Sequence, residues 1–367
     1  MHYNPWSWAD EYLTFVAKES GTFTFTPSSS NVISYSTDGG ETWTTGNSVE
    51  VNNGDKVMWK GTMTPQSYYG IGKFGSTGNF DVQGNVMSLL FGDNYKGQTD
   101  LTGKGYAFYE LFRNNTKVIS AENLSLPAST LIKYCYCGMF YGCTSLVTAP
   151  QLPATTLSGD EVWDCYNRMF QDCTSLVTAP ELPATTLSTS CYGYMFKGCT
   201  SLVNAPELPA TTLAVQCYWY MFEDCTSLVT APQLPATTLA SNCYYYMFRG
   251  CTGLVNAPSI LPATTLANNC YGHMFDGCTS LTSAPVLPAT TLTTSCYQYM
   301  FYGCTNLNYI KAMFTTTPSG SSPYYTQNWV NGVSATGTFV KNSAAQWTNT
   351  FNDNAIPTNW TVQTAST

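Results

Sequence analysis

Cysteine is the residue type whose number and spacing in this chain first suggest chemistry. Fifteen cysteines lie between Cys135 and Cys304, and fourteen of them form seven Cys-x7-Cys pairs. Regular pairs of this kind would suit a disulfide framework. Zinc sites need ligands clustered at short spacing, usually together with histidine, so these pairs match a metal site poorly. We therefore expect no metal and no cofactor.

The alternative to disulfides is a buried ladder of reduced thiols. The odd number leaves Cys137 over, and an earlier degenerate copy has Asn115 where later copies have the second cysteine. Asparagine cannot form a disulfide, but either residue can lie inward and hydrogen-bond to backbone groups. The first cysteine of each pair also falls within a predicted short helix. We therefore favour a structural ladder that consists of Asn115, Cys143, Cys173, Cys199, Cys225, Cys251, Cys278 and Cys304.

Other residue types offer little for catalysis. The two histidines are His2 and His273, and His273 occupies a position that other copies fill with tyrosine, which indicates a surface residue. Asp160, Glu161 and Asp164 cluster in one short insertion, where we expect a solvated loop and not a calcium or acid–base site. No phosphate loop, G-x-S-x-G or H-E-x-x-H pattern occurs. We predict no catalytic residues.

The cysteines belong to a repeat, Cys-Tyr-x-x-Met-Phe-x-x-Cys-Thr, which must position them. Successive second cysteines are 30, 26, 26, 26, 27 and 26 residues apart. A period of this length is typical of a stacked solenoid. In each coil a Pro-bearing segment such as Leu202–Leu208 predicts a short strand. Leu213, Cys217 and Met221 then share one face of a predicted short helix, at i, i+4 and i+8.

Composition narrows the class of protein. Charged residues make up 10% of the chain and the net charge is −8, without a run of Lys or Arg. Nucleic acid is therefore an unsuitable partner. No stretch of about 18 apolar residues occurs, so we expect no membrane insertion. No signal peptide is visible at the start. Low charge with abundant Thr, Ser, Asn and Tyr is typical of secreted or surface proteins.

The chain before the repeat reads as all-β. Apolar and polar residues alternate in segments that predict strands at Tyr12–Ala17, Gly21–Thr26, Val32–Ser36, Ser48–Val51 and Lys56–Lys60. Ser36–Trp43 matches the Asp-box pattern S-x-D-x-G-x-T-W, for which we expect a structural hairpin turn, with sugar binding as the alternative. The expected domains are a lead at 1–10, a β-sandwich at 11–100, the solenoid at 101–304 with a degenerate first coil at 101–131, and a C-terminal cap at 305–367.

The line Met-Phe-x-Gly-Cys-Thr-Ser-Leu, followed by a Pro-bearing strand and a Leu-rich turn, resembles the BspA-type leucine-rich repeat of Bacteroides-like surface proteins. The resemblance covers about residues 101–310. The tail and the N-terminal domain are similar to segments that accompany such repeats in gut bacteria and their phages. The sequence thus predicts an α/β leucine-rich-repeat solenoid of about eight coils, with short parallel strands and short helices, preceded by a small all-β sandwich domain.

Comparison of the copies with one another shows where they vary. The inward Cys-Tyr and Met-Phe positions scarcely change, whereas the columns of Trp219 and Glu223 change freely. At 100° per residue from Cys217, both columns point away from the core. Tyrosine, tryptophan and arginine dominate binding hot spots. The candidate binding surface therefore consists of Tyr194, Trp219, Tyr220, Tyr245, Tyr246 and Arg249, with sideways packing between helices as the alternative role for the tyrosines.

Three functions remain open on the sequence. The first is a non-enzymatic extracellular adhesion or binding protein on the cell surface, which presents its repeat to a host protein or glycan. The second is a phage tail or virion adhesin that recognises a protein or glycan of the bacterial surface. The third is a glycan-active enzyme, which would need a pair of carboxylates in a cleft.

Overall fold

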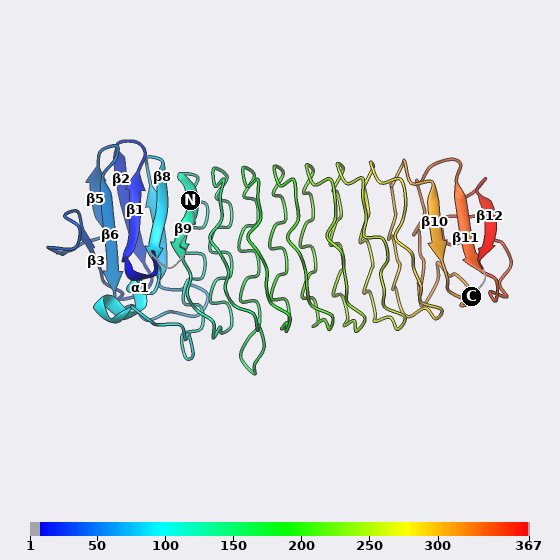
Figure 1. The fold of residues 1–367 in the computed structure, drawn as a ribbon, viewed down its shortest axis with the longest axis horizontal. Helices are drawn as coiled ribbons and strands as arrows, with labels where there is room; N and C mark the ends of the chain where they lie inside the picture. The colour runs from blue at the N-terminus through cyan, green and yellow to red at the C-terminus, as the bar shows by residue number, and fades with distance from the viewer. Residues whose placement is uncertain (1–7, 366–367) are drawn as a thin grey trace. The chain divides into compact units, whose positions relative to one another are not determined.

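The computed structural model describes residues 8–365. The chain forms two compact units, one ending at Pro183 and the other beginning at Ala184. The first unit contains a β-rich domain with two sheets and the first coils of the repeat. The second contains further coils and the C-terminal segment (Figure 1).

The N-terminal domain is built from one six-stranded and one three-stranded sheet. The larger sheet has the order β4-β3-β6-β1-β8-β9 and the smaller the order β5-β2-β7. The strands of the larger sheet are β1 (Leu13–Ala17), β3 (Ile33–Ser36), β4 (Thr44–Thr45), β6 (Lys56–Gly61), β8 (Phe80–Asn85) and β9 (Val118–Ser125). Those of the smaller sheet are β2 (Gly21–Pro27), β5 (Ser48–Val51) and β7 (Gly72–Ser76). Three short helical elements complete the domain: η1 (Trp8–Asp10), α1 (Ser88–Phe91) and η2 (Gly92–Asn94).

The alternation of apolar and polar residues predicts five of these nine strands. All five strands expected from the sequence are present, and their ends differ from the expected ones by at most one residue. The inward side chains meet between the sheets, where the ring of Phe15 on β1 packs edge-on against Phe23 on β2, with centroids 5.4 Å apart. Burial of such rings supplies most of the stabilisation of a small β domain.

The β domain and the first coils share one core. β9 pairs with β8 in parallel, and its residue Ser120 bridges in parallel to Thr148 of the next coil. Inside, the ring of Phe112 stacks on Phe74 of β7 at 5.6 Å and on Phe140 of the following coil at 5.2 Å. The β domain thus covers the apolar end that the first coil would otherwise expose to water.

The segment from the first to the second cysteine of each copy is a run of four-residue turns, so the predicted short helix is wrong. Every fourth residue has a left-handed backbone; in the coil of Cys217 these residues are Gln216, Tyr220 and Asp224, with φ of 57°, 56° and 60°. A right-handed helix does not accommodate such residues. Within residues 8–365, α-helix occurs only at α1.

Backbone hydrogen bonds in these turns alternate between the coil itself and the next one. The amide of Trp219 donates to the carbonyl of Gln216 in its own coil at 3.3 Å, whereas the amide of Tyr220 donates to the carbonyl of Tyr245 in the next coil at 2.9 Å. These bonds between coils hold residues in a backbone conformation that is costly for any residue except glycine. Side-chain directions therefore repeat every four residues and do not advance by 100° per residue.

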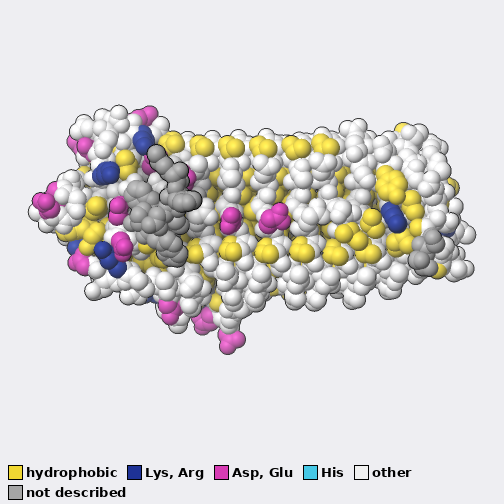
Figure 2. Space-filling model, in the orientation of Figure 1, with side chains coloured by type: hydrophobic (Ala, Val, Ile, Leu, Met, Phe, Trp, Pro, Cys, Tyr) yellow, Lys and Arg dark blue, Asp and Glu magenta, His cyan; other side chains and the backbone are white. Residues whose placement is uncertain are grey.

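The Pro-bearing segments form a reduced parallel sheet. The pairing of coils is parallel, as predicted, but it consists of isolated bridges, for example from Asn204 to Thr230 and from Thr230 to Asn256. Proline has no amide hydrogen, so Pro206 and Pro209 interrupt a continuous ladder. Exposed valines lie beside these bridges, and Figure 2 shows apolar side chains in separate rows across the coils on the face it presents.

The interior of the coils is a set of stacked columns. In the second unit the rings of Phe196, Phe222, Phe248, Phe275 and Phe301 lie 5.5 to 5.7 Å apart and nearly parallel. After the coils, β10 (Tyr309–Ala312), β11 (Thr338–Asn342) and β12 (Thr361–Ala365) form a parallel sheet in that order. Between β10 and β11 the four-residue turns recur once more, with a left-handed backbone at Tyr324, Asn328 and Gly332.

Candidate functional site

In five successive coils of the second unit the middle left-handed position carries an aromatic ring, and together these rings form an outer column. In the second unit the rings of Tyr194, Tyr220, Tyr246, His273 and Tyr299 stack in that order, with centroids 4.7, 4.6, 4.2 and 4.6 Å apart. Neighbouring rings lie within 19° of parallel. We call these five residues the outer aromatic stack. Their contact offsets the strain of a left-handed backbone at a bulky residue.

Trp219 and Tyr245 pack edge-on against this stack. The ring of Trp219 lies 4.9 Å from that of Tyr194, and the ring of Tyr245 lies 4.3 Å from that of Tyr246. Both side chains are half-buried, as are Tyr194, Tyr220 and Tyr246. Burial raises the pKa of Tyr220 to about 12, so its phenol stays protonated at neutral pH. The structure thus brings the five predicted aromatic residues together, with three rings stacked on one another and two packed edge-on against them.

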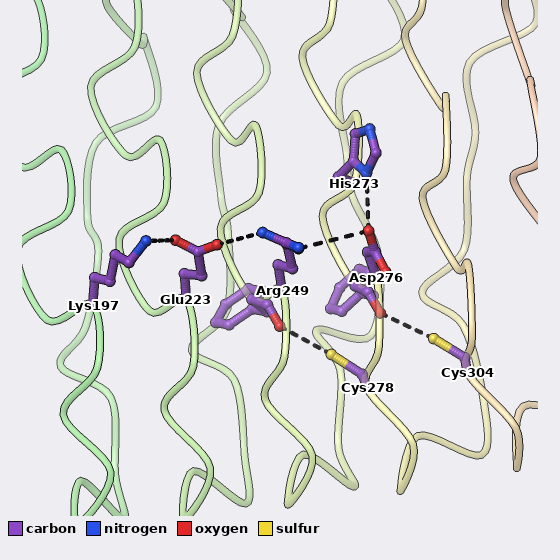
Figure 3. A network of polar contacts seen from close by, with 9 residues as sticks. Lys197, Glu223, Arg249, His273, Asp276, Cys278 and Cys304 are labelled. Carbon is purple, nitrogen blue, oxygen red and sulfur yellow. Dashed lines mark hydrogen bonds and ion pairs between the residues drawn. The ribbon is translucent and has the colours of Figure 1, made fainter.

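A row of alternating charges runs across the coils beside the stack (Figure 3). Glu223 lies between Lys197 and Arg249, at 2.5 and 2.8 Å, and Arg249 also approaches Asp276 at 3.8 Å. Asp276 in turn contacts His273 of the outer aromatic stack at 2.9 Å. We call Lys197, Glu223, Arg249 and Asp276 the charge row.

The column of Glu223 does not have the orientation expected from the sequence. Glu223 was predicted to point away from the core, but its side chain is only 2% exposed. The 100° rule placed it outside because the rule assumes a helix, and the backbone is a series of four-residue turns. Arg249, predicted as a surface contact, keeps 49% of its side chain exposed while it pairs with two carboxylates. Its guanidinium also lies 5.3 Å from the centre of the Tyr246 ring.

Sequence reasoning missed that the charged residues form a connected row. The available signal was the alternation of sign at intervals of 26 or 27 residues, from Lys197 to Glu223 to Arg249 to Asp276. A period that matches the repeat places such residues next to one another in adjacent coils.

The second cysteine of each pair donates to the coil before it. The thiols of Cys225, Cys251, Cys278 and Cys304 reach backbone carbonyls of the preceding coil at 3.0 to 3.1 Å. The acceptor is a phenylalanine carbonyl in each case, that of Phe275 for Cys304 (Figure 3). In the degenerate copy the side-chain amide of Asn115 donates to the carbonyl of Phe74 at 3.2 Å.

None of the fifteen cysteines takes part in a disulfide in the structure, and all are buried. Burial raises the pKa of Cys243 and of Cys296 to about 12. A thiol that stays protonated is neither a nucleophile nor a metal ligand. Within residues 8–365, no three His, Cys, Asp or Glu side chains gather as a metal site would require.

The acidic insertion does not form a carboxylate pair in a cleft. Glu161 pairs with Lys133 at 3.3 Å, and Asp160 is exposed. Asp164 is half-buried, and its burial raises the pKa of the carboxyl to about 6. The Asp box is a closed turn, in which Asp38 accepts hydrogen bonds from the backbone and hydroxyl of Thr42, and the indole of Trp43 donates to the carbonyl of Gly40 at 3.1 Å.

Comparison with known proteins identifies the repeat. A family model described as BspA type leucine rich repeat region matches with six copies, over residues 112–254, 164–308 and 219–339. These ranges together cover residues 112–339, which is more than half of the chain. No curated protein matches the sequence.

Proposed function

Because the chain belongs to the BspA-type leucine-rich repeat family, we propose that it is a non-enzymatic extracellular protein that binds a protein or glycan on another surface. BspA-type repeat proteins are typically surface binding or adhesion proteins, and the family is generally non-catalytic. Within the described residues, no helix is long and apolar enough to cross a membrane.

The observation that carries the proposal is the outer aromatic stack with its edge-on partners. Trp219 and Tyr245 come from two adjacent coils, are half-buried and pack edge-on against Tyr220 and Tyr246, while the guanidinium of Arg249 lies over the Tyr246 ring. These residue types contribute most to binding energy in protein interfaces. Their ring faces are already packed, so they are pre-organised and lose little conformational entropy when a partner arrives.

We expect Trp219→Ala combined with Tyr245→Ala to weaken attachment by about 30-fold, which corresponds to about 2 kcal/mol. Attachment would be measured by surface plasmon resonance against extracellular-matrix proteins, mucin glycans and bacterial surface polysaccharides. The rings are half-buried, so we also expect a lower melting temperature, and binding must be measured well below it. Unchanged attachment of the double variant would rule out this surface.

Two control variants separate binding from folding. Met221→Ala removes a fully buried side chain of the same coils and lowers stability without changing the surface. Val229→Ala with Val255→Ala removes exposed apolar groups from the strand segments. Both controls should attach like the wild-type chain. Selective attachment to bacterial polysaccharide would favour the phage adhesin, whereas attachment to matrix protein or mucin would favour the bacterial adhesin.

A further inference from the structure

A polar cavity of about 440 Å³ lies in the C-terminal segment of the second unit. It is lined by residues 317–320, which follow β10, and by six residues that follow β11, namely Trp347, Thr348, Thr350, Asn352, Asn354 and Ala355. None of its lining residues belongs to the outer aromatic stack or to the charge row. Ligand pockets in proteins span about 300 to 1,000 Å³, so the space suits one or two small rings.

The lining is polar and carries no charge. It contains the hydroxyls of Thr317, Ser319 and Thr348, the amides of Asn352 and Asn354, and the indole of Trp347. Anionic ligands such as phosphates are normally held by Arg, Lys or a metal ion, and lipids by an apolar lining. A wall of hydroxyls and amides instead suits a neutral ligand that is rich in hydroxyl groups.

Several of these groups have hydrogen-bond donors that are not used by another residue within the described part of the chain. The side-chain oxygen of Asn354 accepts from the backbone of Asn328 at 2.7 Å, and that of Asn352 accepts from the backbone of Asn354 at 2.8 Å. These bonds fix both amides. Within residues 8–365, their NH2 groups and the hydroxyls of Thr317 and Thr348 make no side-chain hydrogen bond to another residue. Groups oriented in this way can bind a ligand without first breaking protein contacts.

Aromatic side chains adjoin the polar groups. The ring of Trp347 stacks on Phe314 at 5.8 Å and its indole nitrogen donates to the carbonyl of Phe314, so this wall is rigid. Trp347 is the aromatic residue of the lining. A rigid aromatic wall next to hydroxyls and amides matches the mixed apolar and polar faces of a sugar ring.

We propose that this cavity binds a neutral sugar unit. The hydroxyls of Thr317 and Thr348 and the amides of Asn352 and Asn354 hydrogen-bond its hydroxyl groups, and the wall at Trp347 contacts its apolar face. This site is separate from the aromatic surface on the coils, and it goes beyond the function proposed above. The same chain would then have two independent contacts with its surroundings.

In the test, the whole chain is titrated with the methyl glycosides of glucose, galactose, mannose and N-acetylglucosamine. Binding is monitored by saturation-transfer NMR. A neutral glycoside should bind, and Thr317→Val with Thr348→Val should weaken it by about tenfold, because two hydrogen bonds are lost without a change in shape. Thr364→Val makes the same substitution on β12, outside the cavity, and should leave binding unchanged.

Each contrary result would overturn the proposal. These results are no binding by any of the four glycosides, equal binding by the double valine variant, or stronger binding of sialic acid than of every neutral glycoside. Trp219→Ala with Tyr245→Ala should leave glycoside binding intact. Failure of the cavity site and failure of the aromatic surface can therefore be told apart.

Discussion

Glu223 shows how one residue can depend on its two neighbours in the stack of coils. Its carboxylate is almost fully buried, and two cations from adjacent coils compensate for the loss of water. A buried charge with its partners adds little net stability, but the same charge without them is strongly destabilising. The charge row therefore acts mainly by favouring the observed order of coils. If one coil were looped out of the stack, residues of like charge would become neighbours.

We expect Lys197→Met with Arg249→Met to destabilise the fold by about 3 to 5 kcal/mol, since it leaves Glu223 buried without a cation. The triple variant that adds Glu223→Met should recover most of this loss. Urea denaturation of the three proteins measures the difference. Equal stability of the double and triple variants would show that the charge row is no more than a solvent-screened surface network, which contributes about 1 kcal/mol or less.

At the scale of the element, the coil is defined by left-handed residues every four positions. Asparagine, aspartate and glycine suit such positions, and the third one in each coil holds Gly142, Asp172, Gly198, Asp224, Gly250, Gly277 and Gly303. At Gly250, with φ of 71°, a Cβ atom would also collide with the carboxylate of Asp224 in the coil before it. An added Cβ at this position would therefore strain the backbone and would force the Asp224 side chain to move.

Gly250→Ala should therefore lower the free energy of unfolding by about 1 to 3 kcal/mol. Ser227→Ala serves as the control, because Ser227 is exposed and has an ordinary backbone conformation. Thermal and urea unfolding of both variants test the expectation. If the two alanine variants were equally stable, left-handed geometry at this position would not be essential.

The sequence was sufficient for the period, the parallel pairing of coils and five of the nine strands of the β domain, because these depend on apolar spacing and turn residues. It was misleading for the turns. Leu213, Cys217 and Met221 recur at intervals of four, which fits both one face of a helix and successive four-residue turns. What decides between them is the bonding of Tyr220 to the next coil, which a single copy of the repeat does not contain.

The candidate site was predictable in part for the same reason. Residue types indicated an aromatic cluster, and the structure gathers those residues. The helical angle overestimated how far Trp219 and Glu223 reach into solvent. The cavity residues Trp347 and Asn352 gave no signal, because they come from a segment outside the repeat and meet residues 317–320 only through the fold.

At the scale of the whole molecule, the buried protons link stability to pH. The thiols of Cys135, Cys243 and Cys296 have pKa values of about 12 in the folded chain, against 9.0 for a free thiol, and burial is the main cause. The folded protein therefore keeps protons that the unfolded chain loses. This stabilisation is fully present below pH 9 and is lost as the pH rises towards 12.

We expect the free energy of unfolding to fall between pH 9 and pH 11, by about 1.4 kcal/mol per pH unit for each such thiol. Urea titrations at pH 7.5, 9, 10 and 11 in the presence of reductant measure the slope. Cys243→Ala with Cys296→Ala should flatten it in proportion. A stability that does not change over this interval would mean that these thiols are not shielded from water.

The alternating backbone bonds have a consequence for how such a gene can change. Each coil presents the same set of backbone amides and carbonyls to its neighbour. For example, the amide of Tyr194 donates to the carbonyl of Trp219, and the amide of Tyr220 donates to the carbonyl of Tyr245. A coil duplicated or deleted by unequal recombination would leave every remaining junction with a compatible partner. Only columns whose residues differ from coil to coil, such as the charge row, would be altered. The number of copies can therefore change while the architecture is retained.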